Sequence, residues 1–111
     1  MQEKGILLPK LDRLKPTLES TLVKLLEEAG ELAQAVGKFR GLNGERVTLT
    51  EEQALQVIAC ELLDVAQTTV SMMFVLEEQH GVDLDEALRD HIAKLEAKGY
   101  LSPGNRHKAN N

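Results

Sequence analysis

The chain has 111 residues with 42% hydrophobic content and a net charge of −5, which predicts one soluble domain with its own core and no second domain. The acidic balance argues against a general nucleic-acid-binding surface. The only cysteine, Cys60, excludes an intrachain disulfide and suits a reducing compartment, and the N-terminal apolar run Ile6–Leu8 is too short for a signal peptide. We therefore expect a cytoplasmic protein.

Residues 1–15 predict a short leading helix. Three leucines there have helical spacing, namely Leu7, Leu11 and Leu14, and Pro9 interrupts the pattern.

The second predicted helix runs from Pro16 to about Phe39. Pro16 suits a first helical turn, where its missing N–H has no partner to lose, and an apolar pattern with a period of 3.6 residues follows it. Gly30 and Gly37 lie inside this helix and cost about 1 kcal/mol each relative to alanine. Close approach of a neighbouring helix at these glycines would compensate for that cost.

The third predicted helix runs from Glu51 to about His80. Thr50 followed by Gln53 is a capping-box pattern at its start, and Gly81 ends it. We expect this to be the central helix of the fold.

The interior of this central helix is apolar almost all round. Between Ala54 and Leu76 its only charged residues are Glu61 and Asp64. Such a helix is surrounded by protein, and its two carboxylates and several glutamine, threonine and serine residues argue against a membrane span.

A fourth predicted helix begins after Asp83, which forms a capping signal with Glu86, and runs to about Lys98. The polar stretch 102–111 has no periodicity and predicts a disordered tail after a single domain, residues 1–101. The expected fold is all-α, an antiparallel bundle of three main helices plus the short N-terminal helix. Three helices leave the central one with too few partners, so we expect self-association to complete the bundle.

Two pairs of carboxylates stand at helical spacing on the two longest predicted helices. Glu28 and Glu31 form one pair, and Glu61 and Asp64 form the other. Residues three apart on a helix are neighbours, about 5–6 Å apart at Cβ, so packing of the two helices would gather four acidic groups. A helical wheel places Glu28 at the border of the buried face, whereas Glu27 points away from it.

Magnesium is the leading candidate for a cation among these carboxylates, because it takes oxygen ligands and commonly bridges carboxylates to substrate phosphates. Lys24, Lys94 and Lys98 are candidates to neutralise those phosphates. Two alternatives remain open. Glu28 and Glu31 would be an exposed acidic face, or Glu61 and Asp64 would form ion pairs with basic residues.

The two motifs, Glu28-x-x-Glu31 and Glu61-x-x-Asp64, resemble the signature of the MazG-like all-α nucleoside triphosphate pyrophosphatases. The resemblance extends over about residues 18–100. It includes the stretches Lys24–Leu32, Glu61–Val65, Gly81–Leu88 and Lys94–Leu95.

This resemblance implies an enzyme that hydrolyses a (d)NTP to the monophosphate and pyrophosphate, with a role in clearing the nucleotide pool. It implies Mg²⁺ as cofactor, with Mn²⁺ as a substitute, and a homodimer or homotetramer with active sites in the helix bundle. The four carboxylates of the motifs would be the catalytic and metal-binding residues, Glu28, Glu31, Glu61 and Asp64. Substrate contacts would fall to Lys24, Lys94, Lys98 and His91, with Lys98 near the place of an arginine that members commonly carry.

A different class of function also accommodates the sequence. The chain would then be a non-catalytic helical module that binds a nucleotide or a protein, and its carboxylates would be structural. For His91, the alternative to a phosphate contact is a core histidine on an apolar stripe.

Overall fold

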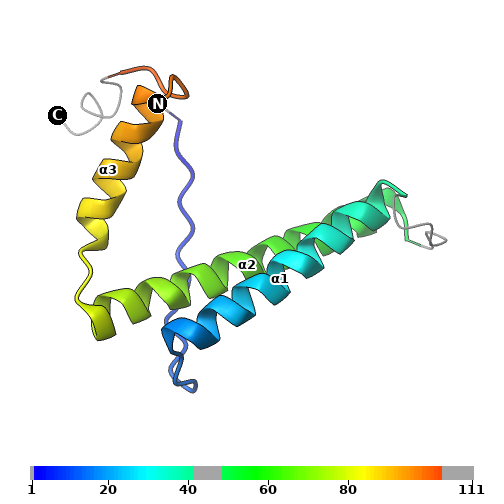
Figure 1. Cartoon of the computed structure of the whole chain (residues 1–111). Coiled ribbons are helices and arrows are strands. Elements are labelled where there is room, and N and C mark those ends of the chain that lie inside the picture. The colour runs from blue at the N-terminus through cyan, green and yellow to red at the C-terminus, as the bar shows by residue number, and fades with distance from the viewer. Residues whose placement is uncertain (1, 42–48, 104–111) are drawn as a thin grey trace.

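The computed structural model of the protein describes residues 2–41 and 49–103. Within them the fold is all-helical, with α1 at Leu18–Phe39, α2 at Glu51–His80 and α3 at Leu84–Ala97 (Figure 1). The three long helices predicted from the sequence are confirmed. Most of the predicted tail, residues 104–111, lies outside the described residues.

Side-chain caps explain where the helices begin. At the start of α2, the Gln53 backbone N–H donates to Thr50 Oγ1 at 3.1 Å, and the Thr50 N–H donates to Gln53 Oε1 at 3.0 Å. This reciprocal pair satisfies two backbone donors that the first helical turn leaves open. Thr17 and Ser20 form the same arrangement before α1. Asp83 alone caps α3.

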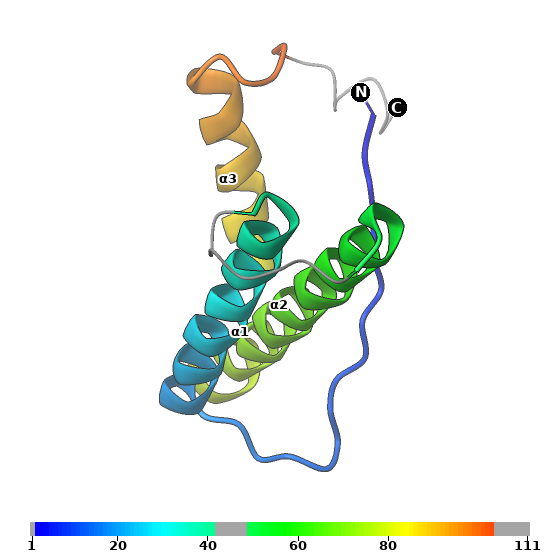
Figure 2. The same cartoon turned by 90° about the vertical axis from the view of Figure 1, so that its right-hand side faces the viewer.

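Helices α1 and α2 form an antiparallel hairpin and lie side by side along their length (Figure 2). The apolar core between them is small. In the described chain its buried members are Ala35, Ala54 and Val75. Thr21, Glu28 and Thr68 are also buried, so half of these buried positions are polar or charged. A buried glutamate in so small a core is the first indication of a functional site.

The third helix does not complete a bundle in this chain. After Gly81, α3 turns away from the hairpin, and in the described residues only α1 and α2 pack extensively (Figure 1). No residue of α3 is buried. The antiparallel bundle of three main helices, predicted to be completed by self-association, is therefore not formed within the single chain, and its completion by further copies stays a prediction. The left-handed backbone of Gly81, with φ of 66°, ends α2 and changes the direction of the chain there.

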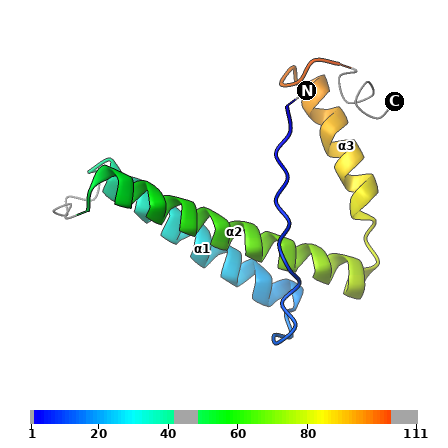
Figure 3. The same ribbon diagram turned by 180° about the vertical axis from the view of Figure 1, so that it is seen from behind.

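The N-terminal segment is not helical, so the prediction of a short leading helix is also wrong. Residues 2–17 form a non-helical arm that crosses α2 and bends at Asp12 and Arg13 before α1 (Figure 3). The arm is held by α2 side chains, because Gln67 donates to the carbonyl of Pro9 at 2.8 Å and Gln79 donates to that of Pro16 at 3.0 Å. These glutamines lie about 18 Å apart along the helix axis, whereas residues 9–16 coiled as a helix would cover only about 10 Å.

Much of α2 is open to solvent in the single chain. Leu55, Leu62 and Leu63 are 47%, 55% and 46% exposed, although the sequence predicts a central, enclosed helix. Helix α2 is also long and apolar enough to cross a membrane, by length and composition alone. That criterion is weak evidence, because the core helix of a soluble protein meets it too, and Glu61 and Asp64 lie near the middle of this one.

Two glycines should respond oppositely to alanine. Gly81→Ala should lower the free energy of unfolding by about 1–2 kcal/mol, because a Cβ is strained in left-handed backbone. Gly30→Ala should raise it by about 0.5–1 kcal/mol, because Gly30 is exposed inside α1 and an added Cβ would meet nothing within 4 Å. The close approach predicted at Gly30 is thus not found within the chain. Urea titrations of both variants measure the difference, and a destabilised Gly30→Ala would contradict the expectation.

Candidate metal centre

Three carboxylates from two helices converge on one point. One oxygen each from Glu28 and Glu31 of α1 and Glu61 of α2 lie within 4.8 Å of one another. Glu28 is buried, Glu61 is half-buried and Glu31 is exposed. The structure thus brings together three of the four carboxylates that the sequence singled out.

Two oxygens of this cluster lack a hydrogen-bond donor. Glu28 Oε2 and Glu61 Oε2 are both buried, and no group in the described chain donates to either. A buried acceptor without a partner costs about 1–3 kcal/mol, and more when it is charged. A cation bound between them would remove that cost, so the arrangement suits a metal such as Mg²⁺ with oxygen ligands.

Lys24 supplies the nearest positive charge. Its Nζ donates to Glu28 Oε1 at 3.0 Å, one helical turn away. This hydrogen bond and the charge of Glu28 raise the pKa of Lys24, so the ammonium stays charged beside the cluster. Because Lys24 is largely exposed, the ion pair itself adds little to stability. It neutralises one oxygen of Glu28 and leaves the other for a ligand.

The proximity of like charges affects Glu31. The Glu28 carboxylate raises the pKa of Glu31 most, followed by partial loss of solvent and then by Glu61. A carboxylate whose pKa moves toward neutrality holds a proton more readily than an ordinary surface glutamate.

Asp64, the fourth predicted carboxylate, lies outside this group. The sequence predicts that Glu61 and Asp64 are both buried, but Glu61 is half-buried and Asp64 is exposed. The two side chains are neighbours about 60° apart around the helix, and Glu61 faces α1 while Asp64 lies on the flank. Asp64 still lines the cleft described next, beside Glu28.

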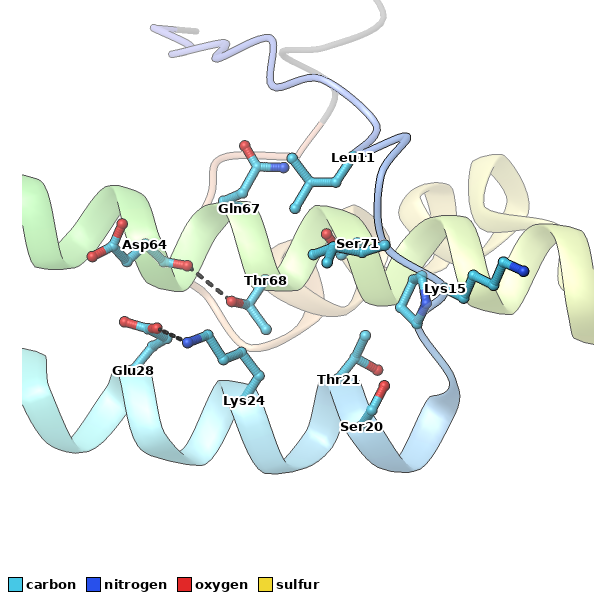
Figure 4. A pocket seen from close by; sticks show the side chains of 12 residues that line it. Leu11, Lys15, Ser20, Thr21, Lys24, Glu28, Asp64, Gln67, Thr68 and Ser71 are labelled. Carbon is cyan, nitrogen blue, oxygen red and sulfur yellow. Dashed lines mark hydrogen bonds and ion pairs between the residues drawn. The ribbon is translucent and has the colours of Figure 1, made fainter.

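A cleft of about 520 Å³ opens beside the carboxylates (Figure 4). Helix α1 lines it with Ser20, Thr21, Lys24 and Glu28, and α2 lines it with Asp64, Gln67, Thr68 and Ser71. The N-terminal arm forms the remaining wall with Leu11, Leu14, Lys15 and Pro16. The acidic side chains occupy one end of the cleft and the arm occupies the other.

The sequence reasoning missed the polar wall of this cleft. Thr68 donates through Oγ1 to the backbone carbonyl of Asp64 at 3.0 Å, and Gln67 holds the arm. The available signal was the run of polar residues following Asp64 on an otherwise apolar helix.

Three further residues predicted to contact substrate lie on α3. Lys94, Lys98 and His91 belong to the helix that turns away from the hairpin (Figure 1). His91 lines a separate cleft of about 480 Å³ between α2 and α3, together with Phe74 and Leu88. Within one chain, the structure does not bring these three residues to the carboxylate cluster.

The fold and the cluster together define a class, a helical protein with a candidate cation site between two antiparallel helices. The comparison with known families gives the particular group. The MazG nucleotide pyrophosphohydrolase domain matches residues 16–99, so the chain belongs to this family. No curated protein and no solved structure matches the chain.

Proposed function

We propose that this protein hydrolyses a nucleoside triphosphate, ribo or deoxyribo, to the monophosphate and pyrophosphate with the help of Mg²⁺, as a step in clearing the nucleotide pool. The observation that carries the proposal is the pair of buried carboxylate oxygens without donors, Glu28 Oε2 and Glu61 Oε2, in a member of a nucleotide pyrophosphohydrolase family. Buried carboxylate oxygens without a hydrogen-bond donor are suited to bind a cation.

Glu28, Glu61 and Glu31 would hold the metal, with Asp64 as the fourth carboxylate at the mouth of the cleft. Bound Mg²⁺, or Mn²⁺ in its place, would supply positive charge that polarises the phosphate chain. The donor set fits a hard cation, since it contains oxygen only and carries several negative charges.

The side chains around the cluster have separable roles in this proposal. Glu31 is the exposed carboxylate of the cluster and would accept the proton of the attacking water through the oxygen that does not bind the cation. The Lys24 ammonium faces the same end of the cleft and would offset charge that develops on the phosphate oxygens.

Self-association is part of the proposal, as a homodimer or homotetramer. Three small apolar residues make up the buried apolar core of the described chain, whereas three leucines of α2 are about half exposed, namely Leu55, Leu62 and Leu63. A second copy that covered them would bury the apolar surface that the hairpin leaves open. Lys94, Lys98 and His91 of a second copy would then be the substrate contacts that α3 cannot make in its own chain.

Pyrophosphate release from the common ribo- and deoxyribonucleoside triphosphates, with and without Mg²⁺, tests the activity directly. We expect at least one triphosphate to yield its monophosphate and pyrophosphate in equal amounts, and chelation of the metal to stop the reaction. Release of inorganic phosphate and a diphosphate would contradict the proposed bond cleavage. A triphosphate that binds without any product would favour the non-catalytic alternative.

The raised pKa of Glu31 predicts opposite effects of acid on the metal-free and metal-bound protein. A carboxyl group with a raised pKa in the folded state stabilises the fold at low pH, and this contribution is lost as pH rises through the folded pKa. Acidification toward the ordinary glutamate pKa of 4.5 should therefore make the metal-free fold more stable through this group. Protons compete with the cation, so the increase in melting temperature caused by Mg²⁺ should shrink over the same range.

Thermal melts across this range, with Mg²⁺ or with chelator, measure both effects. Glu31→Gln serves as the matched control, because it cannot titrate and should flatten the pH dependence of the metal-free protein. A magnesium-induced increase that is constant with pH would count against Glu31 as part of the cation site.

A further inference from the structure

Residues 9–16 of the N-terminal arm make side-chain contacts with α2 that lie outside the carboxylate cluster. Its two ends are fixed to α2 by glutamines, Gln67 at the Pro9 carbonyl and Gln79 at the Pro16 carbonyl. Between these anchors the Lys10 ammonium contacts both carboxylate oxygens of Glu78, at 2.6 and 2.7 Å. The same ammonium lies 5.6 Å from the centroid of the Phe74 ring.

The Lys10–Glu78 ion pair is separate from the wall of the main cleft, although the anchors Gln67 and Pro16 belong to that wall. Lys10, Glu78 and Gln79 line a second, smaller hollow behind the arm and do not line the main cleft. Leu11 and Leu14 lie between the anchors and line both the main cleft and this hollow. These leucines are 37% and 64% exposed, although they belong to a segment tied down at three places. An ordered arm that presents exposed leucines to a cleft is suited to contact the apolar part of a ligand.

The position of the arm in the cleft determines which part of a bound nucleotide its leucines would contact. The carboxylates and Lys24 occupy one end of the cleft, where the phosphates and metal would lie, and the arm occupies the other end (Figure 4). Asp64 and Ser71, which mark the two ends on α2, are about 10 Å apart along the helix axis. A ligand that places its phosphates at the carboxylates therefore extends its nucleoside toward Leu11 and Leu14.

We propose that residues 9–16 act as a strap whose leucines form the nucleoside-binding wall, and that the Lys10–Glu78 ion pair is a positioning contact that holds this wall. This inference rests on the proposed function for the identity of the ligand. The strap affects substrate binding and leaves the chemistry at the carboxylates unchanged, because Lys10 and Glu78 line neither the main cleft nor the carboxylate cluster.

Charge reversal at the anchor separates this role from simple electrostatics. Lys10→Glu and Glu78→Lys each place like charges together and should each raise KM roughly three- to tenfold, with kcat within about twofold of wild type. The double variant, Lys10→Glu with Glu78→Lys, restores an ion pair and should return KM to near the wild-type value. If long-range charge alone mattered, the two single variants would move KM in opposite directions, because the triphosphate is an anion.

Glu77→Lys is the matched control. It makes the same charge change beside Glu78, but Glu77 lines the cleft near α3 instead of contacting the arm. It should leave KM within about twofold of wild type. Leu14→Ala tests the wall itself and should raise KM without lowering kcat.

The assay uses the 111-residue chain, Mg²⁺ and whichever common triphosphate has the highest kcat/KM. Opposite KM shifts in the two reversals, no KM shift in either, or a fall in kcat at unchanged KM would each overturn the strap. If the wild type binds triphosphates without hydrolysis, the proposed reaction fails, and dissociation constants from calorimetry replace KM in the same comparison. A wild type that binds no triphosphate would overturn both proposals.

Discussion

Glu61→Gln should lower kcat/KM for triphosphate hydrolysis by roughly 10²–10³-fold, the size expected when one group that organises developing charge is removed. Glutamine keeps the shape of the side chain but loses the charge that would hold the cation. Glu61 is half-buried and its Oε2 has no donor in the described chain. The substitution therefore removes no hydrogen bond at this oxygen from the metal-free protein. The melting temperature of metal-free Glu61→Gln should therefore equal or exceed that of the wild type, because like-charge repulsion is relieved.

Glu28→Gln should behave in the same way, with the added loss of the Lys24 ion pair. Glu27→Gln is the matched control, since Glu27 is the neighbouring glutamate on α1 and is exposed. It should retain activity within about twofold. Asp64→Asn measures the contribution of the carboxylate outside the cluster. Full activity in Glu61→Gln would contradict the assignment of this cluster as the metal centre.

Leu62→Glu should separate the protein into monomers at concentrations where the wild type is associated. Burial of a leucine contributes about 1.5–3 kcal/mol. In a two-fold dimer each substitution occurs twice, so the loss of about 3–6 kcal/mol corresponds to a rise of more than about 100-fold in the dissociation constant. Leu62 is 55% exposed in the single chain and lies near the middle of α2. Sedimentation velocity over a range of concentrations measures the change.

Gln56→Glu controls for the added charge, because Gln56 is an exposed polar residue of the same helix and should leave the assembly intact. Leu62→Ser separates loss of apolar area from burial of a charge, and should weaken association less than Leu62→Glu. Activity measured on the same samples tests whether α3 of another copy completes the site. A wild-type protein that sediments as a monomer would contradict the proposed assembly.

The helices themselves could be predicted because their determinants are local. Thr50 with Gln53 and Asp83 with Glu86 mark helix starts through contacts that span one turn, and Gly81 marks an end through its own backbone. The structure confirms each of these boundaries within the described residues. The spacing of Glu28 and Glu31 could also be predicted, because both residues lie on the same helix.

The arm could not be predicted from its own leucines. Leu7, Leu11 and Leu14 have helical spacing, but the carbonyls of Pro9 and Pro16 bind side chains of α2 far along the chain. Those two contacts require an extended path. A periodic pattern reports which residues would share a helical face, and says nothing of a distant partner that favours another conformation.

By itself, the sequence determined that this protein is helical, where α2 and α3 begin, where α2 ends, and that acidic pairs recur on the two longest helices. It placed the start of α1 at Pro16, whereas the helix begins at Leu18 after the Thr17 cap. Only the tertiary structure decided which carboxylates meet. The packing of α1 on α2 buries Glu28, brings it to Glu31 and Glu61, and leaves Asp64 on the flank. The physical reason is that helical spacing sets the angle between side chains on one helix. Burial and unpartnered charge depend on how a second helix lies against it.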